Sequence, residues 1–363
     1  MQIKELIKHL ETAYPLKYQE SYDNSGLLVD RLNQEVNSAL LTLDITPEVI
    51  DEAISKKADM VISHHPVIFK PLKKILNSTP TEKIIRKALA HDIAIYSAHT
   101  NMDSAQGGTN DKVCELLKLK NCKVLSTMEN FLFKVVVFVP HDHTEKVRSA
   151  LFEAGGGAIG EYDSCSYNTS GQGTFRAGDN TNPFVGKKGE LHFEDEIKIE
   201  TIVPKHLLSK AISNMINAHP YEEVAYDIFA MENKYEAAGL GRVGELPEAM
   251  PKEKFLTYVK DALQADHLRY AGEAETIKKV ALCTGSGSSL ASLAASKNAD
   301  VYISADFKYH EFQAAAEHLM VIDAGHYHTE KFAKDIFYNL INEKFPKFAL
   351  YLSELNTNPI NIH

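Results

Sequence analysis

Apolar side chains recur at helical spacing at the start of the chain, and strand-like and helix-like segments then alternate. The first 15 residues, MQIKELIKHLETAYP, predict an amphipathic helix with Ile3, Leu6, Ile7 and Leu10 on one face. From Ser38 the apolar run SALLTLDI leads to TPEVIDEAISKKA, with Thr46 as helix cap and Pro47 at the first helical position, and then to DMVIS. Another helix is expected at about 81–91, before the strand IAIYSAH. This alternation is typical of βαβ units in a mostly parallel sheet.

The pattern changes near Thr127. Six expected segments follow in this order: the strand FLFKVVVFVP, a helix at about 144–154, the strand-rich stretch YDSCSYNTSGQGTF, the strand EIKIETIVP, a helix at about 205–218 and the strand VAYDIFAM. The order β-α-β-β-α-β is ferredoxin-like, and the loop RAGDNTNPFVGKKGE interrupts it. We expect residues 127–232 to form an inserted ferredoxin-like α+β domain, and residues 1–126 and 233–363 to form one α/β domain around it.

The first pattern returns after the insertion, behind a helix expected at about 251–263. The segment VALCTGSGSSLASLAASKNADVYISAD can be laid over ALLTLDITPEVIDEAISKKADMVISHH, and LAHDIAIYSAHTNMD lines up with AAEHLMVIDAGHYHTE. The second alignment sets His99 against His326 and Asp103 against Glu330. βα units resemble one another by chance, but a matching His-x-x-x-acid pair at corresponding strand ends favours an internal duplication. The expected fold class is α/β, with duplicated, mostly parallel βα sheet layers forming a metal-binding domain.

Composition excludes several classes of protein. The net charge of −10, from 49 acidic and 39 basic residues, argues against non-specific nucleic-acid binding. The four cysteines are scattered without a Cys-x-x-Cys pair, which argues against a disulfide framework or a zinc ribbon. The charged N-terminal helix is unlike a signal peptide, and no apolar stretch approaches the ~20 residues of a membrane span. We therefore expect a cytoplasmic protein without membrane partners.

Histidines and carboxylates gather where strands are predicted to end. Four such ends carry His64 and His65; His99 with Asp103; Asp306 with Lys308 and His310; and His326 with Glu330. Ligands bind beyond the carboxyl ends of strands in open α/β sheets, and imidazole with carboxylate suits Zn²⁺, Mn²⁺, Fe²⁺, Co²⁺ or Ni²⁺. A single strand-end histidine is more often a hydrogen-bonding residue, but two matched pairs beside His64 and His65 favour a metal centre. Five or six ligands suit two divalent ions better than one.

The spacing within these motifs sets conditions on the backbone. Neighbouring strand residues point to opposite faces, so His64 and His65 can act together only where their strand ends, and Pro66 favours a turn there. Asp103 and Glu330 stand four residues after a histidine and share its face only in a helix. Asp103 and Glu330 can therefore turn back toward the site if each of those two strands turns helical, and GHYHTEKFAKDIFYNLINEKF looks like a helix start.

Glycine-rich segments give weaker signals. GGGAIG at 155–160 satisfies G-x-G-x-x-G but follows a predicted helix, so a helix end with a turn is favoured over a dinucleotide site. Gly285, Ser286 and Gly287 lie between a strand and a helix, where they either hold a phosphate or cap the helix. In GGTND, Thr109 or Asn110 is the expected helix cap. Lys308 and Arg242 are conceivable phosphate partners, and His99 or His310 could move protons.

Several blocks resemble the NIF-three-like family, whose members are usually named GTP cyclohydrolase 1 type 2 homologues. The blocks are DNSGLLV, VISHHPVIFKPLK, YSAHTNMD, GGTND and DAGHYHTE, while NPFVG and AHPYEEVAYDI resemble the middle domain of the longer bacterial members. The resemblance implies a dinuclear centre with Asp103 as bridging carboxylate and the ligands His64, His65, Asp103, His326 and Glu330. His99 lies in a matching motif without an assigned ligand role. The resemblance also implies a ring-shaped homohexamer with metal sites facing an internal cavity.

These observations predict a dinuclear metal-dependent hydrolase. It would act through a metal-bound hydroxide on a small molecule, a nucleotide or related compound, with GTP ring opening as the named candidate. The alternative is a non-catalytic metal-binding regulatory or adaptor protein whose inserted domain senses a ligand. A DNA-associated role of a hexameric ring is a third possibility, and the acidic balance counts against it.

Overall fold

The computed structural model describes residues 1–362 and shows a mixed α/β protein with several sheets. The chain forms two compact units: unit 1 comprises residues 1–127 and 236–362, and unit 2 is Met128–Tyr235. Each unit has its own hydrophobic core. Unit 1 contains two sheets, and each of them carries strands from both sides of unit 2 in the sequence.

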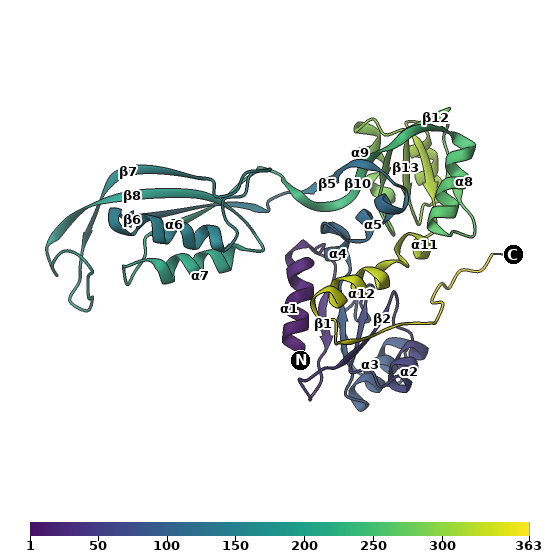
Figure 1. The fold of residues 1–363 in the computed structure, drawn as a ribbon, viewed down its shortest axis with the longest axis horizontal. Helices are drawn as coiled ribbons and strands as arrows, with labels where there is room; N and C mark the ends of the chain where they lie inside the picture. Colours follow the sequence, from purple (N-terminus) through teal and green to yellow (C-terminus); the bar gives the residue numbers. More distant parts are fainter. Residues whose placement is uncertain (363) are drawn as a thin grey trace. The chain divides into compact units, whose positions relative to one another are not determined.

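The first sheet of unit 1 has the strand order β1-β4-β3-β2-β15. Its strands are β1 (Gly26–Val29), β2 (Ser38–Thr42), β3 (Met60–Ser63), β4 (Ala94–Ser97) and β15 (Ala349–Leu352). All neighbours are parallel except β1, which runs antiparallel to β4. The helices α2 (Pro47–Ser55) and α3 (Pro80–Ala90) cover one face, and α1 (Ile3–Ala13) and α12 (Ala333–Lys344) cover the other (Figure 1).

The helices α2 and α3, which cover this sheet, each begin with a threonine cap followed by proline. The side chain of Thr46 accepts a hydrogen bond from the amide of Val49, and Pro47 is the first residue of α2. Thr79 and Pro80 repeat the arrangement at the start of α3. Each threonine satisfies an amide that has no partner within the helix, and proline loses nothing at this position.

The second sheet of unit 1 has the order β11-β14-β13-β12-β10-β5. Its strands are β5 (Lys120–Met128), β10 (Tyr235–Pro251), β11 (Arg269–Ala271), β12 (Thr276–Leu282), β13 (Val301–Ser304) and β14 (Met320–Asp323). β12, β13 and β14 are parallel, whereas β11 and β10 run antiparallel to β14 and β12. The helices α5 (Thr109–Leu116) and α8 (Lys252–Leu263) share one core with this sheet, and α9 (Ala291–Ser296) and α10 (Tyr309–Ala316) share another.

Short helices follow directly after two of the parallel strands. α4 (Thr100–Ser104) comes three residues after the end of β4, and α11 (His326–Glu330) comes three residues after the end of β14. Both strands therefore turn helical, which is the condition under which Asp103 and Glu330 can turn back toward the histidines. The 3₁₀ turns are η1 (Leu16–Tyr18), η2 (His141–His143) and η3 (Ser288–Leu290).

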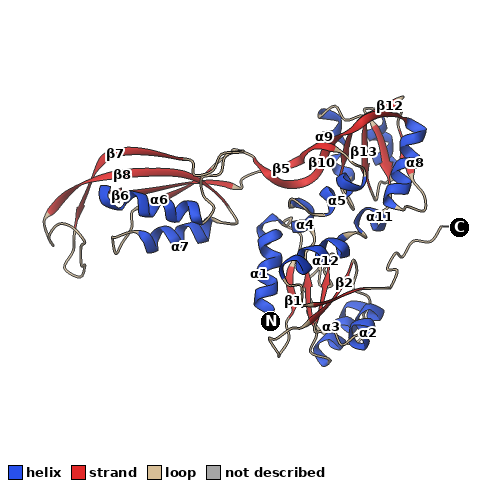
Figure 2. Ribbon diagram, viewed as in Figure 1, coloured by secondary structure: helices blue, strands red, loops and turns tan. Residues whose placement is uncertain are grey.

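Unit 2 is a four-stranded antiparallel sheet with two helices on one face (Figure 2). In chain order its elements are β6 (Leu132–Pro140), α6 (Thr144–Glu153), β7 (Ser166–Arg176), β8 (Leu191–Pro204), α7 (Leu208–Ala218) and β9 (Tyr226–Ala230). The strand order is β7-β8-β6-β9. Valines of β6 alternate toward the helices and form the core with Leu151 and Met215.

The segment GGGAIG lies outside the helices and strands of unit 2. GGGAIG begins just after α6, and Gly155 and Gly157 have φ values of +96° and +80°, so the segment is a turn after a helix. In the described part of the chain, no helix is both long and apolar enough to cross a bilayer.

Candidate metal centre

Five side chains from the ends of three parallel strands meet in unit 1. His64 and His65 follow β3, Asp103 lies in α4, and His326 and Glu330 lie in α11. They form two groups in which the ligand atoms lie within 4.8 Å of one another. One group is His64, Asp103 and Glu330, and the other is His65, His326 and Glu330. A third group joins His64 and His65 to His99. The structure therefore brings together all five residues that the resemblance implies as ligands.

The backbone explains how two neighbouring histidines face one cluster. The amides of His64 and His65 donate to the carbonyl oxygens of Thr42 and Leu43 at 3.3 and 3.0 Å, so the chain stays beside β2 beyond the end of β3. The two rings lie only 5.1 Å apart between centroids. His64 is completely buried, whereas His65 is partly exposed.

Each histidine is oriented through its Nδ1 atom. His64 Nδ1 lies 2.8 Å from the carbonyl oxygen of Ala98. The Nδ1 atoms of the other three histidines each contact a carboxylate: His65 with Asp44 at 2.7 Å, His99 with Asp23 at 2.8 Å, and His326 with Asp306 at 2.7 Å. Such contacts orient each ring and direct its Nε2 atom at the cluster, as in metal sites where an outer carboxylate holds a ligating histidine.

The positions of the histidine Nε2 atoms suit ligation of a metal ion better than direct contact between the rings. His64 Nε2 is buried and has no hydrogen-bond partner among residues 1–362, although it lies 3.5 Å from Asp103 Oδ1. His65 Nε2 and His326 Nε2 are 3.3 Å apart, so two neutral rings would bring lone pairs together and two protonated rings would bring positive charges together. A cation between these atoms and the buried carboxylates removes both costs. The donor set therefore fits a divalent ion.

Opposite charges shift the pKa values within the cluster. Burial alone would lower the pKa of His65, but Asp44 and Glu330 raise it to about 10. His326 behaves alike, because Glu330 and Asp306 outweigh burial and raise its pKa to about 11. Burial would raise the pKa of Glu330, but the three histidines hold it well below the usual range. Burial raises the pKa of Asp103, and the charge of Glu330 adds to this.

Glu330 occupies the middle of the cluster. Its Oε2 atom lies 3.0 Å from His65 Nε2 and 2.9 Å from His326 Nε2, and its Oε1 atom lies 3.8 Å from His64 Nε2. Glu330 thus belongs to two of the three donor groups, whereas Asp103 belongs to one.

Thr109 and Asn110 of the segment GGTND hold Asp103 in place through hydrogen bonds. Thr109 donates a short hydrogen bond to Asp103 and lies 2.8 Å from the hydroxyl of Thr284. Asn110 donates to the carbonyl of Asp103 and accepts from the amide of Thr284. The helix cap is Gly108, so the expectation that Thr109 or Asn110 caps α5 was wrong. Both side chains instead connect α4 to the end of β12.

The glycine loop after β12 lies against the cluster. Gly285 has φ +63°, and a Cβ atom there would overlap Glu330 Oε1 and stand 3.3 Å from His326 Nε2. The amides of Gly285 and Gly287 donate at 3.0 Å to Thr329 and Ser304, and Ser286 is exposed. The loop therefore forms a wall of the cluster with two amides already used, and phosphate binding by residues 285–287 stays a prediction.

The two proposed proton carriers lie in different surroundings. The His99 ring is 5.2 and 5.3 Å from the rings of His64 and His65. His310 is exposed on α10 beside Tyr309 and Gln313. No hydrogen bond, ion pair or ring contact within the described chain joins His310 to the cluster.

Two carboxylates that orient histidines were not predicted from the sequence, and the surroundings of Arg242 differ from those expected of a phosphate partner. Asp44 and Asp23 orient histidines, and the available signals were the acid that ends SALLTLD and the block DNSGLLV. Arg242, considered as a phosphate partner, is buried and donates to Asp111 and to the carbonyl oxygens of Ala105, Gly239 and Gly241. Its guanidinium is used within the protein.

Comparisons with known proteins identify relatives that match nearly the whole chain. The family model Duf34/NIF3 (NGG1p interacting factor 3) matches residues 1–359. A protein of Halalkalibacterium halodurans named GTP cyclohydrolase 1 type 2 homolog is 43% identical over 344 residues, covering 93% of this chain and 92% of the relative. A Bacillus subtilis protein of the same name is 41% identical over 98% of this chain and 97% of its own length.

Solved structures show the same fold over the whole chain. The Bacillus cereus protein related to NIF3 superposes with a TM-score of 0.85 at 39% identity, covering 100% of this chain and 99% of that one. Staphylococcus aureus protein SA1388 superposes with a TM-score of 0.78 at 29% identity, with the same coverage.

Proposed function

The chain belongs to the Duf34/NIF3 family, and from that premise we propose that it is a hydrolase that depends on two divalent metal ions and acts on a nucleotide or a related compound. The observation that carries this proposal is the pair of donor groups that share Glu330. The printed name of the relatives, GTP cyclohydrolase 1 type 2 homolog, makes GTP the first substrate to test.

Each donor group would hold one ion. His64, Asp103 and Oε1 of Glu330 form one set, and His65, His326 and Oε2 of Glu330 form the other. Three protein ligands for each ion leave coordination positions open, as in catalytic rather than structural sites. The geometry favours Glu330 as the bridging carboxylate, in place of the Asp103 that the resemblance implied.

Bound Zn²⁺, Mn²⁺, Fe²⁺, Co²⁺ or Ni²⁺ would supply a Lewis acid and lower the pKa of a coordinated water. The residues of the chain would then position the groups around it. His99 is the better candidate for moving a proton, because Asp23 holds its Nδ1 atom at the edge of the cluster. Burial would raise the pKa of Asp23, but His99 and Thr100 hold it well below its usual range, so Asp23 remains a carboxylate that can stabilise a protonated His99.

Aromatic side chains beside the cluster support a substrate that contains a ring. The rings of Tyr22 and Phe69 are exposed and lie 6.4 Å apart. Phe69 is also 6.4 Å from the ring of His99, and Asn24 donates to the carbonyl of Ile68 at 2.6 Å. A base could stack on these rings next to the proposed ions.

The architecture supports two finer proposals. The strand orders β1-β4-β3-β2 and β11-β14-β13-β12, with β1 and β11 antiparallel, support an internal duplication. The element order and strand order of unit 2 support a ferredoxin-like inserted domain. The homohexameric ring stays a prediction.

Elemental analysis combined with a hydrolysis screen tests the function. Wild type, His65→Ala and the control His318→Ala, which changes an exposed histidine, would be compared on nucleotides, pterin precursors and phosphoesters. We expect two metal equivalents and turnover in wild type and the control, with both reduced in His65→Ala. A metal-loaded protein that hydrolyses nothing on the panel would contradict catalysis and favour the regulatory alternative. Unchanged metal content in His65→Ala would contradict the site itself.

A further inference from the structure

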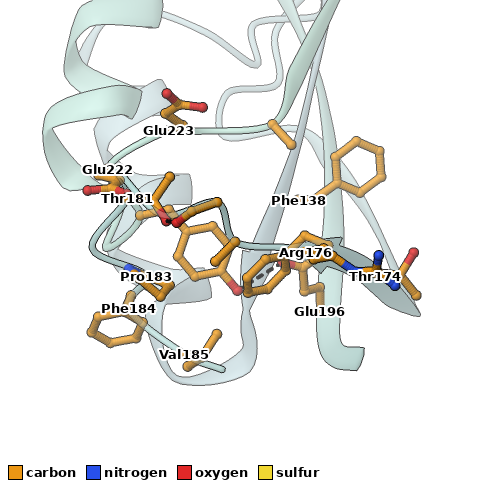
Figure 3. Close-up of a pocket in the computed structure, with 16 residues that line it drawn as sticks. Phe138, Thr174, Arg176, Thr181, Pro183, Phe184, Val185, Glu196, Glu222 and Glu223 are labelled. Atoms are coloured by element: carbon orange, nitrogen blue, oxygen red, sulfur yellow. Dashed lines mark hydrogen bonds between the residues drawn. The ribbon is translucent and has the colours of Figure 1, made fainter. Parts of the chain in front are cut away.

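Unit 2 contains a cavity of ≈ 450 Å³ of its own (Figure 3). We propose that this cavity binds a small organic cation, a protonated amine or amidine attached to an apolar or aromatic body. The cavity volume lies in the range of small-molecule sites. The proposal is independent of the metal centre.

The floor of the cavity is the sheet face that α6 and α7 leave open. Val137 and Val139 of β6 and Ile199 of β8 pack toward the helices. Because side chains alternate along a strand, Phe138 and Glu196 face the opposite side, and both line the cavity.

Two loops form the sides of the cavity. One connects β7 to β8 and contributes six residues between 177 and 185, and the other connects α7 to β9 and contributes four residues between 221 and 225. The amide of Asn182 in the first loop donates to Glu222 in the second at 2.8 Å. This hydrogen bond holds the two loops together at the rim.

Four aromatic side chains line the cavity. They are Phe138, Phe175, Phe184 and Tyr221. Figure 3 shows Pro183 and Val185 beside Phe184. The rings of Phe184 and Tyr221 are 6.1 Å apart, and Phe184 is 54% exposed. An apolar ligand body would cover this surface, and aromatic faces also attract cations.

Glu196 gives the cavity its charge preference. Its Oε1 atom accepts a hydrogen bond from the Tyr221 hydroxyl at 3.0 Å, while residues 1–362 supply none to its Oε2 atom. Three carboxylates, Glu196, Glu222 and Glu223, line the cavity against one guanidinium, Arg176. A half-buried carboxylate with one unused oxygen among aromatic rings recognises a cation with N–H groups. An anion would meet repulsion.

The surroundings fix Glu196 in this position. A Cβ atom on Gly173 would overlap Glu196 Oε2, so glycine leaves room for the carboxylate beside β7. His219 donates through Nε2 to the carbonyl of Phe138 at 2.9 Å, and its Nδ1 accepts from the amide of Tyr221 at 3.1 Å. These bonds place the Tyr221 hydroxyl on Glu196 before any ligand arrives, which reduces the entropy lost on binding.

Calorimetric titration of the full chain with three matched probes tests the proposal. The probes are 2-phenylethylamine, the neutral 2-phenylethanol and the anionic phenylacetate. We expect the amine to bind more tightly than the other two. Glu196→Gln, which keeps an acceptor for Tyr221, should weaken amine binding by at least about tenfold. The control Glu161→Gln, at an exposed acid of the same unit, should leave it unchanged.

Two further variants separate this cavity from other sites. Phe184→Ala should also weaken amine binding, whereas His65→Ala should leave it unchanged, because the metal centre takes no part. No amine binding by wild type, equal binding by Glu196→Gln, or tighter binding of phenylacetate would each overturn the proposal. Loss of amine binding in His65→Ala would overturn it as well.

Discussion

Asp44 shows how a residue outside the proposed ligand set can control it. One carboxylate oxygen contacts His65 Nδ1, and the other accepts a 2.6 Å hydrogen bond from Thr357 in the C-terminal segment. Burial would raise the pKa of Asp44, but His65 and Thr357 together hold it below the usual value. Asp44 therefore stays charged and keeps the Nε2 atom of His65 directed at the cluster.

Replacing Asp44 by asparagine should weaken metal binding by about 10- to 100-fold, the usual cost of losing such an outer carboxylate. Competition with a fluorescent chelator measures this affinity. Asp51→Asn, which changes an exposed acid on the neighbouring helix α2, is the matched control. Equal affinities in the two variants would show that Asp44 does not orient His65.

Gly285→Ala should remove metal from the protein. The new Cβ atom would overlap Glu330 Oε1, and φ +63° is unfavourable for alanine. We expect metal content to fall by at least one equivalent and the backbone strain to cost about 1 kcal/mol. Gly178→Ala is the control, since a Cβ atom there meets nothing within 4 Å. Full metal content in Gly285→Ala would contradict the assigned position of Glu330.

His206 in unit 2 should titrate far below an ordinary histidine. It packs beside Phe131 and Tyr235, and burial lowers its pKa from 6.5 to about 4. The unfolded chain therefore takes up a proton first, so the free energy of unfolding falls as pH drops from 6.5 to 4 and levels off below. An NMR titration of the imidazole carbons measures the pKa directly. A midpoint near 6.5 would show that the ring is solvated.

At the scale of elements, two short helices and the long helix behind them set the site. α4 and α11 return Asp103 and Glu330 to the histidines, and α12 begins three residues after Glu330. α12 lies against the first sheet and α1, with the buried Phe337 6.5 Å from the ring of Tyr14. The packing of α12 therefore helps to hold Glu330 in place.

Phe337→Ala should lower the free energy of unfolding by about 3–5 kcal/mol, because it leaves a cavity in a closed core. Urea unfolding followed by circular dichroism measures the change. Tyr338→Ala alters the adjacent, 37% exposed ring and should cost much less. Equal losses would mean that burial does not decide the contribution of α12.

The sequence predicted the elements and residues that depend on periodicity. His99 with Asp103 and His326 with Glu330 could be found because their spacing repeats at corresponding strand ends. Thr109, Asn110 and Gly285 were misjudged or left open, since a local pattern suggests a cap or a phosphate loop, whereas their contacts come from elements distant in sequence. Whether Asp103 or Glu330 is shared depends on how two sheets pack, which no local spacing encodes.

At the scale of the whole molecule, the centre unites the two outer segments of the chain. His64 and His65 belong to the first sheet, and His326 and Glu330 follow β14 of the second. Residues on both sides of unit 2 must therefore fold together before an ion can bind. Metal binding should accordingly stabilise unit 1, because only the folded state offers the complete donor set.

Anomalous diffraction from crystals of metal-loaded protein, collected above and below the absorption edge, tests whether the two donor groups hold two ions. We expect two anomalous peaks. One should lie between His64, Asp103 and Glu330, and the other between His65, His326 and Glu330. Peaks held by other residues, or no peak in either group from protein that contains metal in solution, would contradict it.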